Sequence, residues 1–115
     1  MDIREDSLLG VPVLKISGEI DHSSASDFDR SAQAHTCLGD HRLIVDLTSC
    51  RYIDSGGLAV FLYLARHLPA RGWLAVVGAD RNVSRLFQIV GLEQEPGFRM
   101  FSRLEEVAAL IESAA

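Results

Sequence analysis

The chain has 115 residues, which is enough for one domain to bury a core without metals or disulfides. Hydrophobic residues make up 48% of it, as in a globular protein, and 16 acidic against 11 basic residues give a formal net charge of −5. This acidic balance argues against a nucleic-acid surface and against an anionic membrane surface, since both favour basic residues.

The first third of the chain is typical of two strands followed by a helix. Val11–Ser17 has the composition of a strand, and an earlier strand is expected within Asp2–Leu8. The turn that follows ends in Ser23 and Ser24, either of which is expected to cap a helix that runs to about Ala34. The residues expected on the inward face of this helix are Ala25, Phe28 and Ala32.

The middle of the chain predicts two buried strands, each followed by a helix. Arg42–Leu47 and Trp73–Gly78 are short apolar runs of the kind found in strands buried on both faces. One helix is expected to follow Asp54, and Asp80 is expected to cap the next, which Gly91 would end in the left-handed conformation. The apolar stripe expected on this second helix is Val83, Leu86, Phe87 and Val90.

The C-terminal part predicts a last short strand, Phe98–Phe101, and a final helix that opens with Ser102 and Glu105 at capping-box spacing. Alternating strands and helices indicate an α/β fold with right-handed crossovers. We therefore expect a single domain over residues 1–115. In it, about four helices cover a mixed, largely parallel open sheet of about four to five strands.

The N-terminus and the cysteines predict a cytoplasmic protein. The opening sequence MDIREDSLLG is charged and shows no secretory signal, and no window reaches the ~18 uninterrupted apolar residues of a membrane span. Cys37 and Cys50 have no metal-ligand spacing and are expected to be reduced thiols. We expect no cofactor, no metal site and no membrane insertion.

Two turns at the carboxyl ends of predicted strands carry the candidate functional residues. One turn contains Asp21 and His22, and the other contains Asp54 and Ser55 directly before a predicted helix. In open α/β sheets, ligands and partners gather where strand ends meet helix N-termini. The two turns can therefore lie close together and form one site.

No catalytic motif is complete around Ser55. A nucleophile elbow reads G-x-S-x-G, whereas Ile53–Gly57 reads IDSGG and lacks the first glycine. A triad of Ser55, His22 and Asp21 is conceivable, but sequence neighbours rarely line up as base and orienting acid. A phosphate-binding loop, G-x-x-x-x-G-K-[ST], is also absent. We therefore expect no enzyme and no catalytic residue, and an esterase built on Ser55 is the least favoured alternative.

The two glycines after Ser55 need a reason beyond capping. Asp54 or Ser55 can cap a helix, but Gly56 and Gly57 each cost up to ~1 kcal/mol relative to alanine inside one. Their expected benefit is close approach, because without side chains nothing would shield the Ser55 hydroxyl from a visiting molecule. The pattern predicts an exposed serine at a helix N-terminus.

The helix after Asp54 has two apolar faces. The residues of its predicted core stripe are Leu58, Phe61, Leu62 and Ala65. The residues of the opposite line are Gly56, Val60, Tyr63 and His67. On a solvated helix this opposite line would be charged, so either a neighbouring helix of the same domain or another protein is expected to cover it.

Four segments together resemble STAS-domain proteins, and most of all the bacterial anti-sigma factor antagonists. They are GEIDHSSA (18–25), LIVDLTSCRYIDSGGLAVFL (43–62), RNVSRLFQIVGL (81–92) and FSRLEEVAALI (101–111). The likeness rests on the ordered combination of G-E-[IL]-D, D-L-x(5)-I-D-S and R-L-F-x(3)-G-L. It covers nearly the whole chain and implies a STAS-like fold for the domain.

The resemblance implies a switch in protein binding. An unphosphorylated antagonist binds an anti-sigma factor that is also a serine kinase, and thereby releases a sigma factor for transcription. The kinase then phosphorylates the serine after the motif aspartate, here Ser55, and a serine phosphatase restores the antagonist. Asp21 matches the acidic residue of the docking surface. The partner-binding residues we expect are Asp21, His22, Asp54, Gly56, Gly57, Val60 and Tyr63.

One position departs from the family pattern. Many members carry a second serine after the phosphorylated one, and here Gly56 takes that place. The departure keeps an alternative open, a non-phosphorylated STAS scaffold or transporter-associated interaction subunit. The apolar helix face also leaves a homodimer possible.

Overall fold

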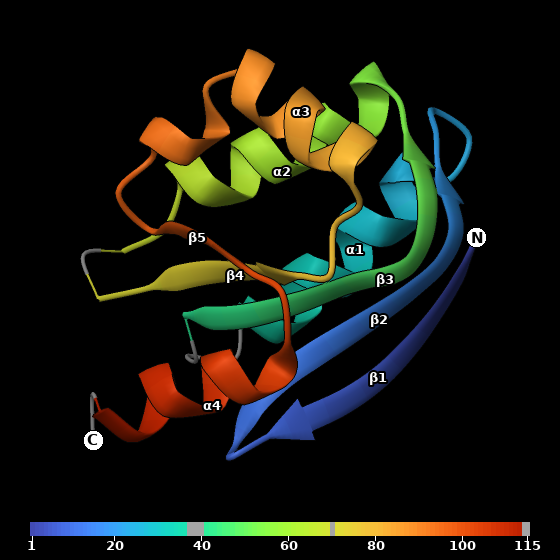
Figure 1. Ribbon diagram of the computed structural model, residues 1–115. Coiled ribbons are helices and arrows are strands. Elements are labelled where there is room, and N and C mark those ends of the chain that lie inside the picture. Colours follow the sequence, from blue (N-terminus) through green and yellow to red (C-terminus); the bar gives the residue numbers. More distant parts are fainter. Residues whose placement is uncertain (37–40, 70, 114–115) are drawn as a thin grey trace.

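A five-stranded sheet forms the centre of the structure, a computed structural model that describes residues 1–36, 41–69 and 71–113 (Figure 1). The strands are β1 (Asp2–Leu8), β2 (Val11–Ile20), β3 (Arg42–Ile53), β4 (Trp73–Val77) and β5 (Phe98–Phe101). Their order in the sheet is β1-β2-β3-β4-β5. β1 runs antiparallel to β2 and every other neighbouring pair is parallel, which confirms the predicted mixed, largely parallel sheet.

Helices cover both faces of the sheet unequally. They are α1 (Ala25–Thr36), α2 (Ser55–Arg66), α3 (Arg81–Ile89) and α4 (Leu104–Ser113), with a short 3₁₀ turn, η1 (Leu92–Gln94). α1, α2 and α3 lie on one face and α4 lies alone on the other (Figure 1). The predicted α/β class is therefore confirmed in the described part of the chain.

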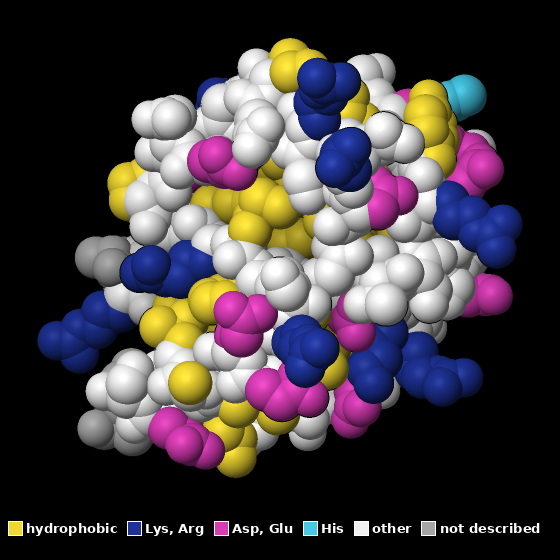
Figure 2. All heavy atoms as spheres, viewed as in Figure 1, with side chains coloured by type: hydrophobic (Ala, Val, Ile, Leu, Met, Phe, Trp, Pro, Cys, Tyr) yellow, Lys and Arg dark blue, Asp and Glu magenta, His cyan; other side chains and the backbone are white. Residues whose placement is uncertain are grey.

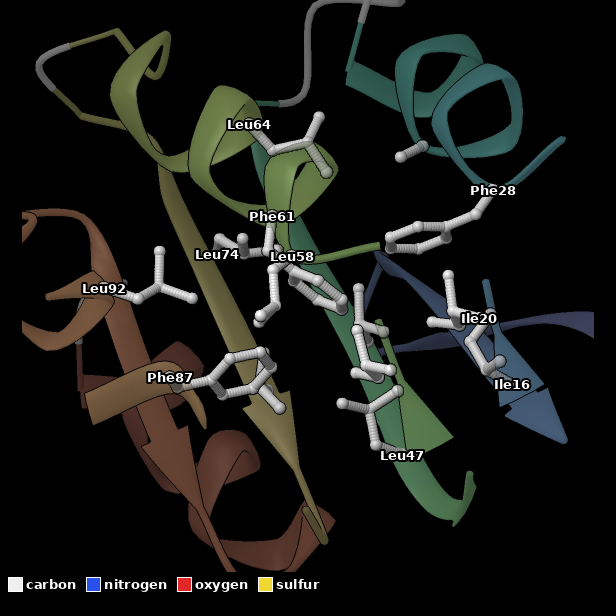
Figure 3. Packing of buried hydrophobic residues seen from close by; sticks show 14 of the residues in the cluster. Ile16, Ile20, Phe28, Leu47, Leu58, Phe61, Leu64, Leu74, Phe87 and Leu92 are labelled. Carbon is white, nitrogen blue, oxygen red and sulfur yellow. The ribbon is translucent and has the colours of Figure 1, made fainter. Parts of the chain in front are cut away.

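Aromatic rings hold the three-helix layer together. The ring of Phe61 in α2 lies 4.9 Å from that of Phe28 in α1 and 5.1 Å from that of Phe87 in α3, so α2 is packed between its two neighbours (Figure 3). This position widens the buried face of α2. Leu64 is buried although the predicted stripe omitted it, and Leu62, which the stripe included, is only half-buried.

Helix ends mostly follow the predicted capping signals. Asp80 accepts a hydrogen bond from the Val83 N–H at 2.8 Å, and Gly91 has φ 76°, as expected for the residue that ends a helix. The predicted capping box before α4 is wrong in one residue. The carboxylate that reaches back to the N–H of Ser102, at 3.0 Å, belongs to Glu106, which lies one residue beyond Glu105.

β3 extends six residues beyond its predicted end. The pairing of β2 with β3 shifts register twice, once between Lys15 and Ser17 and again between Gly18 and Glu19. Each shift inserts one extra residue into β3, as in a β-bulge, and bulges bend and twist a strand. The bulged half of β3 is polar and irregular in burial, so no continuous apolar run marked it as a strand.

The described surface mixes charges of both signs. Figure 2 shows acidic and basic side chains interspersed over the α3, β5 and α4 side, with hydrophobic side chains visible between them. No broad basic area is seen on this face of the described residues. None of the helices in the described ranges is long and apolar enough to span a membrane.

Candidate functional site

The two turns singled out in the sequence meet at one edge of the sheet. Ile20 ends β2 beside Ile53, which ends β3. The Asp54 N–H donates to the carbonyl oxygen of Ile20 at 3.0 Å, and the His22 N–H donates to Asp54 Oδ2 at 2.9 Å. The second half of β3 is what carries Asp54 to this position, so the bulged strand end builds the site.

Asp54 joins the two turns with both of its carboxylate oxygens. Oδ2 accepts from His22, and Oδ1 accepts from the Gly57 N–H at 3.1 Å, which caps α2. The hydrogen bond from the Gly57 backbone, helped by those from His22 and Gly56, lowers the pKa of Asp54 below its ordinary value. The site therefore holds a fixed negative charge at its centre.

Ser55 lies at the outer surface of this arrangement. It is the first residue of α2 and is exposed, and its hydroxyl makes no hydrogen bond with the residues that the structure describes. The predicted exposure of the hydroxyl is confirmed, while its phosphorylation stays a prediction. An exposed hydroxyl at a helix N-terminus is chemically open to modification.

His22 lies beside Asp54 with a largely free side chain. Its imidazole is 90% exposed, and Nδ1 lies 3.6 Å from Asp54 Oδ2, beyond hydrogen-bond distance. The conceivable triad of Ser55, His22 and Asp21 is not assembled, because the carboxylate beside His22 belongs to Asp54. Asp21 is engaged elsewhere in the same turn.

Asp21 shapes the turn that leads into α1. Its Oδ1 accepts from the backbone and hydroxyl of Ser23, at 3.0 and 2.6 Å, and from those of Ser24, at 3.1 and 3.2 Å. These bonds, with that from the Ser23 hydroxyl the largest cause, lower the pKa of Asp21. Asp21 is thus a structural residue of this turn, whatever it contributes to docking.

The two glycines serve the protein's own packing, which corrects the interpretation that they merely uncover Ser55. A Cβ on Gly57 would lie 2.7 Å from Ile53 Cγ2 and 2.8 Å from Ile20 Cγ2, and Gly57 is buried. Its predicted place on the partner-binding surface is therefore wrong. A Cβ on Gly56 would lie 3.2 Å from His22 Cα, so this half-buried glycine also lets the two turns approach.

The outer side of α2 continues the site away from Ser55. Val60 is half-buried, Tyr63 is 50% exposed, and the Tyr63 ring stacks on His67 with centroids 4.1 Å apart. A shallow hollow of about 280 Å³ runs between α1 and α2, and its lining residues are Asp29, Gln33, Ala59, Val60 and Tyr63. The sequence predicted that either a neighbouring helix or another protein covers this face. In the structure α1 borders the face, and Tyr63 stays exposed.

Sequence reasoning missed two parts of this surface. Ala59 is exposed and lies one helical turn beyond Ser55, and Asp29 and Gln33 add polar groups from α1. The i, i+4 spacing of Ser55, Ala59 and Tyr63 was a signal that could have found Ala59. No pattern in the sequence predicted that α1 packs beside this side of α2, because that contact depends on the order of the strands in the sheet.

The family model described as "Mlab, STAS domain" matches residues 3–106 of the chain. The chain belongs to the STAS domain family. Among curated relatives, the anti-sigma-B factor antagonist of Listeria monocytogenes is 33% identical over 78 residues, which cover 67% of this chain and 68% of the relative. The anti-sigma-F factor antagonist RsfB of Mycobacterium tuberculosis is 27% identical over 97 residues, covering 84% and 78%.

Two solved structures have the same fold as this chain. An anti-sigma factor antagonist from Mycobacterium paratuberculosis matches with a TM-score of 0.86 and 22% identity, over 96% of this chain and 93% of that one. The Bacillus cell fate determinant SpoIIAA in its phosphorylated form matches with a TM-score of 0.74 and 19% identity, over 96% and 99%. These findings confirm the resemblance drawn from the sequence motifs.

Proposed function

We propose that this STAS protein is an anti-sigma factor antagonist. It binds an anti-sigma factor with serine kinase activity, releases a sigma factor, and is switched off by phosphorylation of Ser55. The observation that carries the proposal is the free, exposed Ser55 hydroxyl at the start of α2, next to the partly exposed apolar side of that helix. The curated relatives named as antagonists support it.

A phosphate on Ser55 would change binding without unfolding the domain. It would add about −1.5 to −2 charges at neutral pH. A helix N-terminus tolerates an anion, and Ser55 itself is exposed. Asp54 already holds a negative charge one residue away, so a partner packed on this surface would have to accommodate two adjacent anions. Desolvating that charge would weaken the complex, and a serine phosphatase would reverse the change.

Phosphorylation at Ser55 is tested with the anti-sigma factor kinase of the same organism. We expect incubation with ATP to add one phosphate, which mass spectrometry of peptides locates on Ser55. Ser55→Ala should abolish the modification, whereas Ser102→Ala should leave it intact. Ser102 is a matched control because it is exposed and lies just before α4, the helix that covers the other face of the sheet. A phosphate on another residue would remove Ser55 from its role.

The charge effect is tested by affinity. Ser55→Asp should weaken binding to the anti-sigma factor by about tenfold or more, which corresponds to ~1.4 kcal/mol, while Ser102→Asp should not. Both variants should keep the circular dichroism spectrum of the wild type, because both positions are exposed. Unaltered affinity of Ser55→Asp would contradict the charge switch even if the serine is modified.

The second candidate function is a non-phosphorylated scaffold or transporter-associated subunit. It rests on Gly56, which stands where many family members carry a second serine. A pull-down from the native organism separates the two. An ATP-binding kinase among the captured proteins supports the antagonist, and a membrane transport complex supports the scaffold.

A further inference from the structure

His22 lies against the first turn of α2. Its backbone N–H is bonded to Asp54, the residue before Ser55, and its Cα lies 3.2 Å from the Cβ position of Gly56, the residue after it. The Cα atoms of Ser55 and His22 are therefore at most about 9 Å apart, given 3.8 Å between consecutive Cα atoms. A phosphoserine and an imidazole side chain can bridge that distance.

The His22 imidazole is free to turn. It is 90% exposed, and its 3.6 Å approach to Asp54 Oδ2 is too long for a hydrogen bond. Asp54 lies beside it and Asp21 is in its own turn, and Glu19 and Arg51 line a hollow that also borders Asp21. Both oxygens of Asp54 already accept backbone hydrogen bonds, and Asp21 Oδ1 accepts from Ser23 and Ser24. Each of these carboxylate oxygens therefore has part of its accepting capacity already in use.

We propose that the His22 imidazolium binds the phosphate on Ser55 within the same chain. This inference rests on the proposed function, which supplies the phosphate. A phosphate offers a larger charge and more free acceptor oxygens than Asp54, so the ring turns from the carboxylate to the phosphate. Phosphorylation then alters two side chains of the docking surface together, since it adds a dianion at Ser55 and withdraws the imidazole of His22.

The contact depends on pH in a definite way. A phosphomonoester loses its second proton near pH 6, and a positive charge next to the phosphate favours its dianion. The second ionisation of phospho-Ser55 should therefore occur at lower pH when His22 is present. Asp54 has the opposite effect on the phosphate, and it remains the same whether residue 22 is histidine or glutamine.

The test is a ³¹P NMR titration of the full chain between pH 5 and 8. Phosphoserine is installed at position 55 by genetic encoding, so that the sample does not depend on any kinase. We expect the titration midpoint of the wild type to lie roughly 0.5 to 1 pH unit below that of His22→Gln, a modest shift because the site is exposed. His22→Gln should fold normally, since the hydrogen bond to Asp54 uses the backbone N–H.

His67→Gln is the matched control. It removes a histidine from the other end of the 12-residue α2, about 18 Å away at 1.5 Å per residue, and should leave the midpoint unchanged. Equal midpoints for wild type and His22→Gln, or an equal shift in His67→Gln, would overturn the inference. Failure of the kinase to modify Ser55 would instead overturn the proposed function, and the titration distinguishes the two.

Discussion

Replacing Gly57 by alanine should destabilise the domain, although alanine is the better helix former. An added Cβ would lie 2.7 and 2.8 Å from the Cγ2 atoms of Ile53 and Ile20, and 3.0 Å from the Ile20 carbonyl oxygen. Overpacking of this kind typically costs about 1–3 kcal/mol. Three close contacts, one of them with backbone, favour the upper half of that range. Helix propensity returns about 1 kcal/mol, so we expect a net loss of about 1–2 kcal/mol.

The assay is urea denaturation followed by circular dichroism. With a slope of about 1.5 kcal/mol per molar urea, the midpoint of Gly57→Ala should fall by about 1 M without a change in slope. Gly56→Ala is the control, because its nearest contacts are at 3.2 Å and the same propensity gain applies. We expect its midpoint to stay near that of the wild type. If Gly57→Ala were as stable as Gly56→Ala, the close packing of α2 on the strand ends would be refuted.

Three further predictions concern single side chains. Asp54→Asn should lower the urea midpoint at pH 7. The asparagine NH2 group would replace the carboxylate oxygen that accepts from the His22 N–H, so two donors would face each other. Folding lowers the pKa of Asp54, so the difference should shrink as the pH falls below about 4, and a constant difference would contradict this. Leu9 has φ 51° and is 55% exposed, so Leu9→Asn should raise the free energy of unfolding by roughly 1 kcal/mol, and an unchanged urea midpoint would argue against strain. Burial raises the pKa of the Cys50 thiol, so in a Cys37→Ser background iodoacetamide should label it far more slowly than in urea; equal rates would show it to be accessible.

Local signals predicted most of the elements correctly. Asp54 and Asp80 both cap helices as the sequence indicated, and Gly91 ends α3 in the left-handed conformation. These predictions succeeded because a cap depends on atoms within three or four residues. The inward positions of Phe28 and Phe87 followed from helical periodicity for the same reason.

Contacts between distant segments were harder to predict from the sequence. The second half of β3 carries two bulges that break the alternation of buried and exposed residues, so its length could not be read from a pattern. The burial of Leu64 depends on α2 packing between two neighbours, which follows from strand order. Cys37 lies outside the described residues, so the expectation for it stays a prediction.

The glycine pair shows how a correct expectation followed from an incomplete reason. Glycine is required at position 57 because Ile20 and Ile53 pack directly against it, and not because an approaching partner needs the space. Two residues are about 200° apart around an α-helix of 3.6 residues per turn, so Ser55 is turned to nearly the opposite side from Gly57. The tight fit of α2 against the strand ends therefore causes the exposure of the Ser55 hydroxyl.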